Sequence, residues 1–312
     1  MPDFDLLVLG DCNPDLVLRG PDVEPAFGQV ERLVDSADLV VGGSGAIVAC
    51  GAARLGLRTA FAGVVGDDVF GRFMLDALAA RGVDTGGVVV SPHEQTGVTV
   101  VLARPGDRGM LTFPGAIGAL RADAVDADLL GSARHVHVAS YFLQTALTPG
   151  LPDLFGSVRA NGASTSIDPN WDPAERWNGD LKEVLRLTDV FLPNAEEATR
   201  ITGAADPSAA AAELSADVRL TAVKLGREGA LAAASGGVRI QAAAPEDIEP
   251  VDTTGAGDSF DAGLLTGLLN GWSHERALAL ACACGALSTR AAGGTAAQPT
   301  LAEALELVER AA

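Results

Sequence analysis

The chain has 312 residues, of which 48% are hydrophobic, so it can bury a large core in one large α/β domain or two smaller ones. Its 41 acidic residues outnumber the 22 basic ones and give a net charge of -19, which repels nucleic acid and anionic membranes. We therefore expect no nucleic-acid partner and no membrane partner. An anionic substrate would have to be met locally by backbone NH groups, a helix N-terminus or a metal ion.

The N-terminal segment MPDFDLLVLG has neither a basic start nor an apolar run long enough for a signal peptide or a membrane helix. A cytoplasmic location is the resulting expectation. The four cysteines, Cys12, Cys50, Cys282 and Cys284, are too few and too scattered for a disulfide framework. We expect buried reduced thiols rather than metal ligands.

Short apolar runs alternate with longer helical patterns along the chain. The runs that predict buried strands are DLLVLG (5–10), RTAFAGVVG (58–66), HVHVASYF (135–142), STSID (164–168), DVFLPN (189–194) and LTAVKLG (220–226). The stretches that predict helices are 44–56, 68–82, 149–161, 180–188 and 256–292. This alternation is typical of an α/β fold with a doubly wound, mostly parallel sheet flanked by helices.

Two regions interrupt the alternation, residues 13–41 and residues 87–113. We expect their strands to leave the main sheet and form a small β-strand lid. No repeat, low-complexity linker or long charge run marks a second domain, so residues 1–312 are predicted to form a single domain that carries these lid strands. Exposed strand edges recruit partners, so the lid could cover a site in a monomer or join two copies in a homodimer.

The stretch VDTTGAGDSF, residues 251–260, turns sharply and leads into an apolar helical run. It places Gly255 and Gly257 at a helix N-terminus, where free NH groups and the helix dipole favour an anion. Asp258 would stand beside a phosphoryl group bound there and could accept the proton of an attacking hydroxyl. The alternative is an aspartate that merely caps the helix.

Two further stretches point to the same edge of the sheet. Asn194 and Glu197 lie three residues apart where a strand passes into a helix, and an amide and a carboxylate suit a hydrated Mg²⁺. The alternative for this pair is an exposed N-cap followed by a solvated glutamate. The stretch TAVKLGREGALA joins a strand to a hairpin through Gly226 and Gly229, and by itself it predicts only a turn.

Together these residues resemble the ribokinase-like (PfkB) carbohydrate kinases over nearly the whole chain. The matching motifs, in the family's order, are GDCNPDLVL, VVGGSGAIVACGAARLG, GVVGDDVFG, DPNWDPAERW, LPNAEEA, VKLGREGA, DTTGAGDSF and RAAGGTAAQPT. DTTGAGDSF is highly specific for this family. The resemblance implies a ribokinase-like fold and transfer of the γ-phosphoryl group of ATP to a hydroxymethyl group of a sugar of the ribose, fructose or keto-deoxy type.

The resemblance also implies a role for each matched residue. Asp258 resembles the catalytic base, and the amides of Gly255, Ala256 and Gly257 resemble the anion hole. The residues implied to bind ATP are Asn194, Lys224, Gly226, Gly229, Gly255 and Gly257. Asn194 and Glu197 resemble the residues that hold Mg²⁺ through water, whereas the Lys224 side chain could instead be a solvated strand end.

The sugar side of the site is implied in the same way. The residues that match sugar-contacting positions are Asp15, Gly42, Gly43, Ile47, Gln144 and Asp258. Many members have Asn where this chain has Ile47, so one hydroxyl partner is missing and the identity of the sugar stays open. We expect His135 and His137 to be packing or surface residues rather than catalytic ones.

A monovalent cation site beside the anion hole is a further implication. Asp252 and Thr254 match positions that help to ligate potassium in members activated by a monovalent cation. The other ligands would be the backbone carbonyls of Leu287, Arg290 and Gly294. The alternative for Asp252 is a loop acid that hydrogen-bonds its neighbours.

Two other functions compete with sugar phosphorylation. A nucleoside kinase of the adenosine type would need aromatic stacking for its base, but only 4% of the chain is aromatic, and Phe113 in the expected lid would be the candidate. A non-catalytic sugar-binding regulator could use the same fold. It would not need a base beside an anion hole.

Overall fold

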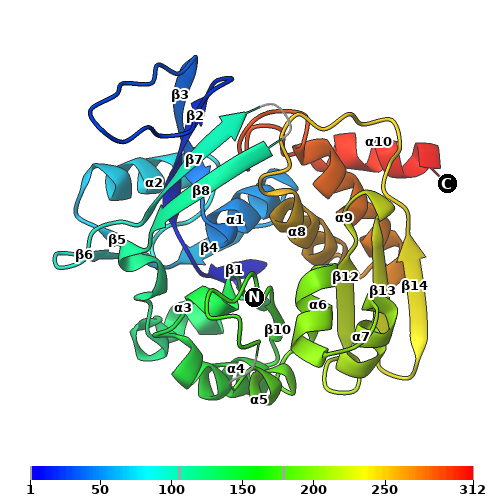
Figure 1. Cartoon of the computed structure of the whole chain (residues 1–312). Coiled ribbons are helices and arrows are strands. Elements are labelled where there is room, and N and C mark those ends of the chain that lie inside the picture. Colours follow the sequence, from blue (N-terminus) through cyan, green and yellow to red (C-terminus); the bar gives the residue numbers. More distant parts are fainter. Residues whose placement is uncertain (1, 105–106, 178–179, 312) are drawn as a thin grey trace.

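The main sheet has eight strands in the order β14-β13-β12-β11-β10-β9-β1-β4 (Figure 1). Its strands are β1 (Leu6–Leu9), β4 (Thr59–Ala62), β9 (His135–Val138), β10 (Ser164–Ile167), β11 (Val190–Phe191), β12 (Leu220–Lys224), β13 (Ala230–Ala234) and β14 (Val238–Ala242). The strands from β12 to β4 run parallel, whereas β13 and β14 extend the sheet antiparallel at one edge. This computed structural model describes residues 2–104, 107–177 and 180–311.

Helices cover both faces of the main sheet. They are α1 (Ser44–Arg54), α2 (Val69–Ala79), α3 (Ala127–Gly131), α4 (Leu151–Ala160), α5 (Leu181–Leu185), α6 (Ala195–Thr202), α7 (Pro207–Leu214), α8 (Ala256–Leu269), α9 (His274–Ser288) and α10 (Leu301–Ala311). Alternate residues of β1 serve the two faces: Leu6 and Val8 pack with α1, α8 and α9, and Leu7 and Leu9 pack with α4. The predicted doubly wound α/β fold is therefore confirmed.

The helix predicted over residues 256–292 is wrong in one respect, because it is two helices. Gly271 follows α8 with a φ of 72°, a left-handed conformation that favours glycine and ends the helix. Ser273 then caps α9 by accepting a hydrogen bond from the Arg276 NH. The two helices pack closely, and a Cβ on Gly267 would lie 2.8 Å from the Cα of Ala277. A glycine turn and a serine cap thus outweigh the continuous apolar pattern.

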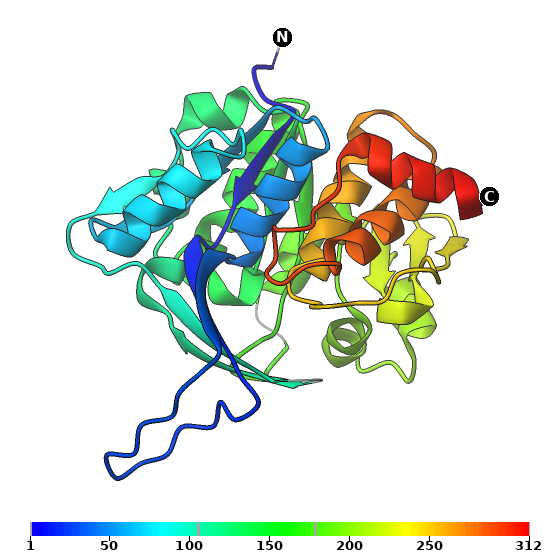
Figure 2. The ribbon, with the colours of Figure 1, turned by 90° about the horizontal axis from the view of Figure 1, so that it is seen from above.

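A second, smaller sheet stands beside the main one and is called the small sheet below. Its strands, in the order β3-β2-β7-β8, are β2 (Asn13–Arg19), β3 (Ser36–Gly42), β7 (Val98–Arg104) and β8 (Asp107–Phe113). All seven residues of β8 are exposed. In Figure 2 the loop between β2 and β3 projects away from the body of the protein.

The regions 13–41 and 87–113 supply the small sheet, apart from residues 105–106, which lie outside the described residues. One short strand of the second region, β6 (Val89–Ser91), does not join the small sheet. It pairs with β5 (Val64–Gly66) in a separate two-stranded sheet.

Two smaller expectations concern the cysteines and membrane helices. Cys12, Cys50, Cys282 and Cys284 are buried free thiols, as predicted. Across residues 2–104, 107–177 and 180–311, no helix is long and apolar enough to cross a membrane.

Candidate active site

The carboxyl ends of β10 and β12 meet the N-terminus of α8 and bring four charged side chains together. Asp168 follows β10, Lys224 ends β12, and Asp258 and Asp261 lie in the first turns of α8. One carboxylate oxygen from each of the three aspartates lies within 4.8 Å of the others. Open α/β sheets bind their ligands at this edge, so these four residues define the candidate active site.

Asp258 does not cap the helix, so the capping alternative is wrong. The N-cap of α8 is Gly255, with a φ of 72° and no side-chain cap. The Asp258 carboxylate instead accepts a hydrogen bond from the hydroxyl of Ser44, at the start of α1. Burial and the nearby charge of Asp168 raise the pKa of Asp258 to about 7, against the opposing effects of Ser44 and Lys224. A carboxylate with this pKa is suited to accept a proton near neutral pH.

Lys224 is not a solvated strand end, because its side chain is only 13% exposed and is held by two aspartates. Its Nζ lies 2.6 Å from Asp168 Oδ2 and 3.2 Å from both carboxylate oxygens of Asp261. Burial alone would lower the pKa of Lys224, but the charges of Asp168 and Asp261 outweigh burial and raise it. The ammonium therefore supplies the cation that this group of acids requires.

Asp261 was not among the site residues predicted from the sequence. It is fully buried in α8, one helical turn beyond Asp258. Burial raises its pKa well above the ordinary value, against the opposing charge of Lys224. The spacing of three residues between two acids on one helix was the available signal, since residues so spaced share a helix face.

Gly294 and Ile47 pack tightly against the glycine turn before α8. A Cβ on Gly255 would lie 2.7 Å from the Cα of Gly294 and 3.1 Å from Cγ2 of Ile47. Ile47 is only 3% exposed and lies against both glycines. Here the side chain of Ile47 supports the turn that carries the expected anion hole. The Ala256 NH donates to the Thr253 carbonyl at 3.3 Å.

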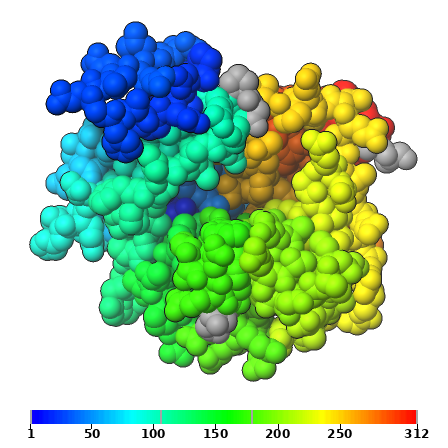
Figure 3. Space-filling model, viewed as in Figure 1, coloured from blue at the N-terminus to red at the C-terminus, as the bar shows by residue number. Residues whose placement is uncertain are grey.

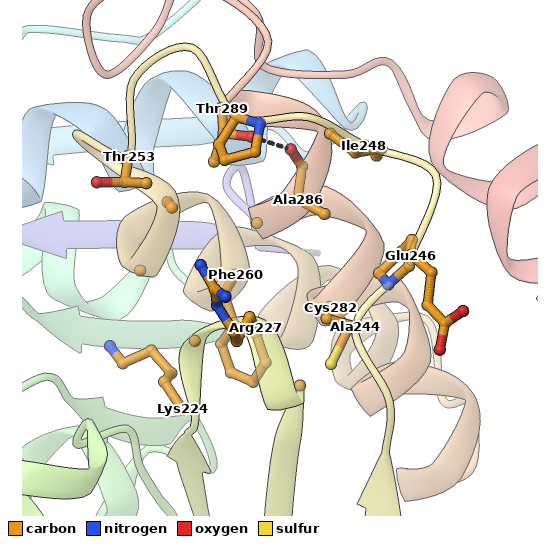
Figure 4. Close-up of a pocket in the computed structure, with 17 residues that line it drawn as sticks. Lys224, Arg227, Ala244, Glu246, Ile248, Thr253, Phe260, Cys282, Ala286 and Thr289 are labelled. Carbon is orange, nitrogen blue, oxygen red and sulfur yellow. Dashed lines mark hydrogen bonds between the residues drawn. The ribbon is translucent and has the colours of Figure 1, made fainter. Parts of the chain in front are cut away.

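A cavity of about 550 Å³ opens beside the start of α8. Lys224, Gly226, Gly229, Ala256 and Gly257 line it, whereas Asn194 and Gly255 of the residues expected to bind ATP do not. Figure 4 shows Lys224 and Thr253 on one side and Glu246 and Ile248 on the other. The apolar walls contributed by Phe260, Cys282 and Ala286 were not foreseen.

The turn between β12 and β13 forms one wall of this cavity. Gly226 and Gly229 have φ values of 61° and 93°. A side chain on Gly229 would overlap the carbonyl oxygen of Ala242. The left-handed backbone at these two positions therefore favours glycine, and at Gly229 the neighbouring strand leaves no room for a side chain.

Asn194 and Glu197 form a capping box at the start of α6. The Asn194 side chain accepts from the Glu197 NH at 2.9 Å, and Glu197 Oε2 accepts from the Asn194 NH at 2.8 Å. Of the expected alternative, only the N-cap is confirmed: Asn194 caps α6 but is half-buried rather than exposed, and Glu197 is only 5% exposed rather than solvated. Burial and the charge of Asp168 raise the pKa of Glu197 to about 7.

Asp15 lies on β2, where the small sheet meets the main one. Any side chain on Gly42 would overlap the Asp15 carboxylate, and Gly43 has a φ of 80°. Burial and the charge of Asp11 raise the pKa of Asp15 to about 7. Asp11 accepts hydrogen bonds from the NH groups of Ser44 and Gly45, at 3.0 and 2.9 Å, and was also not foreseen. Figure 3 shows a hollow between the small sheet and the edge of the main sheet.

Three polar residues around β9 are enclosed. Gln144 is fully buried, and neither polar atom of its side chain has a hydrogen-bond partner in the described part of the chain. His135 and His137 are buried and share hydrogen bonds with the hydroxyl of Ser166. Burial lowers the pKa of His135 to about 4 and that of His137 to about 3. The histidines are packing residues, as predicted.

The loop before α8 is held by hydrogen bonds around Asp252. Its Oδ1 accepts from the NH and the hydroxyl of Thr254, at 2.9 and 2.7 Å, and its Oδ2 accepts from the Gly293 NH at 2.9 Å. Arg108 of β8 donates to Thr254 Oγ1 at 2.5 Å and to Asp252 Oδ1 at 3.3 Å. The sequence held no signal for this contact, because the residues lie far apart in the chain.

Comparisons with known proteins extend over almost the whole chain. Residues 3–301 match the family described as pfkB family carbohydrate kinase. A fructokinase from Klebsiella pneumoniae is 35% identical over 309 residues, which cover 94% of this chain and 95% of that protein.

Solved structures agree with this match. The structure of Arabidopsis thaliana ribokinase complexed with ribose and ATP is similar with a TM-score of 0.86 and 25% identity, over 98% of this chain and 99% of that one. A ribokinase II candidate from E. coli, in complex with ATP and Mg²⁺, has a TM-score of 0.86 and 27% identity over the same shares of the two chains.

Proposed function

Because this chain belongs to the pfkB family of carbohydrate kinases, we propose that it transfers the γ-phosphoryl group of ATP to a hydroxymethyl group of a sugar of the ribose, fructose or keto-deoxy type. The observation that carries the proposal is Asp258. It lies at the start of α8 beside a glycine turn, next to a cavity and with a pKa near 7. That arrangement provides a proton acceptor beside a place for an anion.

The proposed reaction is a single displacement. The sugar hydroxyl attacks the γ-phosphorus of ATP, its proton passes to the Asp258 carboxylate, and the bond to the β-phosphate oxygen breaks to release ADP. Phosphoryl transfer requires little covalent chemistry from the protein, so positioning and charge stabilisation carry most of the rate. The amides of Gly255 and Gly257 stabilise the transferring group, whereas the Ala256 NH donates to the Thr253 carbonyl. The hydroxyl of Ser44 holds the carboxylate of Asp258 toward the acceptor.

Asn194 and Glu197 suit a hydrated Mg²⁺ near the phosphates. Glu197 is buried at the sheet edge, and Oε2 is the carboxylate oxygen that holds the Asn194 NH. Oε1 takes part in no hydrogen bond among the described residues, so it is available to a water ligand of the ion. When bound, Mg²⁺ neutralises charge on the phosphate oxygens.

The sugar is placed by Asp15, Gly42 and Gly43 on one side and by Asp258 on the other. A buried carboxylate accepts hydrogen bonds from two sugar hydroxyls, and the glycines let the ring approach the backbone. Ile47 is buried against Gly255 and Gly294 and offers no hydrogen bond to a sugar hydroxyl, so we expect the deoxy analogue that lacks the matching hydroxyl to be used nearly as well as its parent sugar. Gln144 is fully buried, and its side-chain polar atoms have no hydrogen-bond partner among the described residues.

A coupled ADP-release assay tests the proposal. The panel contains ribose, fructose, a 2-keto-3-deoxy acid and adenosine, each with ATP and Mg²⁺, and the control is the Asp258→Asn variant. We expect ADP release with one or more sugars, and release slower on the order of 10²- to 10⁴-fold with the variant. Preference for adenosine would favour a nucleoside kinase, with Phe113 as its stacking residue. Sugar binding without ADP release would favour the regulator.

A further inference from the structure

Arg108 links the small sheet to the loop that carries the anion hole. It lies on the exposed edge strand β8, and its guanidinium reaches Asp252 and Thr254, which are 144 and 146 residues away in the chain. The guanidinium lies 3.3 Å from Asp252 Oδ1, and the Arg108 and Asp252 side chains are 37% and 21% exposed. The pair is partly shielded from water, so it is stronger than a fully exposed ion pair.

The same two residues were expected to ligate potassium, and the geometry around them does not suit that ion. Both carboxylate oxygens of Asp252 already accept hydrogen bonds, from Thr254, Gly293 and Arg108. The carbonyl of Leu287, another expected ligand, accepts from Nε of Arg290 at 2.9 Å. Arg108 thus donates to side-chain oxygens of Asp252 and Thr254 that were expected to bind the cation. Arg290 donates to the Leu287 carbonyl, which was also expected to bind it.

The loop held by Arg108 leads directly into the anion hole. Thr254 precedes Gly255, the N-cap of α8, and Gly255 packs against Gly294 of the loop that Asp252 also holds. A positive charge placed on Asp252 and Thr254 therefore orders the segment from which the anion-hole amides project. Arg108 delivers that charge from the small sheet, so ordering of the loop depends on how this sheet sits over the site.

We propose that Arg108 is a positioning residue that replaces a monovalent cation at the anion hole of this protein. Its guanidinium orders residues 251–257 when the small sheet covers the site. The inference rests on the proposed function only for its kinetic consequence. The contact of Arg108 with Asp252 and Thr254 is observed in the structure and does not depend on the proposed function.

Steady-state kinetics test the kinetic consequence. Native protein should turn over at the same rate, within about twofold, in potassium, sodium and tetramethylammonium chloride at one ionic strength. Arg108→Met should lose roughly 10- to 100-fold in turnover, the effect of removing one hydrogen bond to a charged group, and potassium but not tetramethylammonium should restore part of it. Arg104→Met is the matched control, because Arg104 ends β7 and pairs with Asp107 and Glu24 instead.

Hydrogen exchange of residues 251–257 without nucleotide tests the contact independently of any activity. Exchange in native protein should be the same in the three salts, whereas in Arg108→Met it should be faster and should slow again in potassium. Strong potassium activation of native protein overturns the proposal, as does unchanged exchange in Arg108→Met. A variant that loses turnover but responds to no cation also overturns it, because Arg108 would then act on the phosphoryl group directly.

Discussion

The edge of the main sheet and the small sheet hold their polar groups in opposite ways. At the main-sheet edge, Asp261 is fully buried and Asp168 nearly so, and a single lysine pairs with both carboxylates. The small sheet exposes every residue of β8, including Met110 at 61% and Leu111 at 62%. The charged group proposed for the chemistry therefore lies on buried elements of the main sheet, whereas the β8 edge of the small sheet is exposed to solvent.

The largest effect that tests this contrast is expected from Asp258→Asn. Removing a general base lowers the rate on the order of 10²- to 10⁴-fold, whereas ATP affinity should remain close to native. Turnover number and ATP binding measure the two effects. Asp206→Asn is the control, because Asp206 caps α7 through the Ala209 NH and Asn caps equally well. Native turnover in Asp258→Asn would end the catalytic assignment.

The stability of Asp258→Asn relative to native protein should increase with pH. The pKa of Asp258 is raised to about 7, so its ionisation penalises the folded state. The penalty is absent below the unfolded pKa of about 3.8, grows as the pH rises and is complete above about 7. Urea unfolding should therefore show Asp258→Asn to be more stable than native protein at pH 8, with the difference vanishing near pH 4.

Lys224→Met tests the buried charge at the main-sheet edge. It leaves Asp168 and Asp261 without their cation, and breaking such a pair costs about 3–5 kcal/mol in the free energy of unfolding. Chemical denaturation measures the loss. The chain has one other lysine, Lys182, which is exposed on α5, so Lys182→Met is a matched control. Equal stability of the two variants would show that Lys224 is not a buried ion-pair partner.

Gly42→Ala tests the small-sheet side. Its Cβ would overlap the carboxylate of Asp15 and displace it, so the catalytic efficiency toward the sugar should fall on the order of 10- to 100-fold. The KM for ATP should stay close to native. Gly109→Ala on β8 is the control, because nothing lies within 4 Å of the added Cβ. A matching loss in both variants would mean that the effect comes from the sheet and not from Asp15.

The smallest effect is expected from Ser44→Ala. The Ser44 hydroxyl stabilises the ionised form of Asp258 and lowers its pKa. A hydrogen bond worth about 1 kcal/mol corresponds to roughly 0.7 pH units, so the acidic limb of the profile of kcat/KM should move upward by about that amount. Ser44→Thr retains the hydroxyl and should keep the native profile. If the acidic limb stays at its native pH in Ser44→Ala, Ser44 does not influence the pKa of the catalytic base.

The sequence alone determined the alternation of elements and the place of the candidate base. Apolar runs predicted the parallel strands β1, β4, β11 and β12, because strands buried on both faces have few polar residues. The glycine turn before Asp258 identified a helix N-terminus, because the left-handed backbone of such a turn, seen at Gly255, favours glycine. Both signals are local, and a local signal can be recognised within a few residues.

Only the tertiary structure decided which side chains meet. Ser44 reaches Asp258 across 214 positions, Lys224 reaches Asp168 across 56, and Arg108 reaches Thr254 across 146. It also decided that Lys224 is buried and that the predicted helix over residues 256–292 is broken at Gly271. Sheet order and the close packing of α8 on its neighbours set these contacts, and neither is encoded in the spacing of residues along one segment.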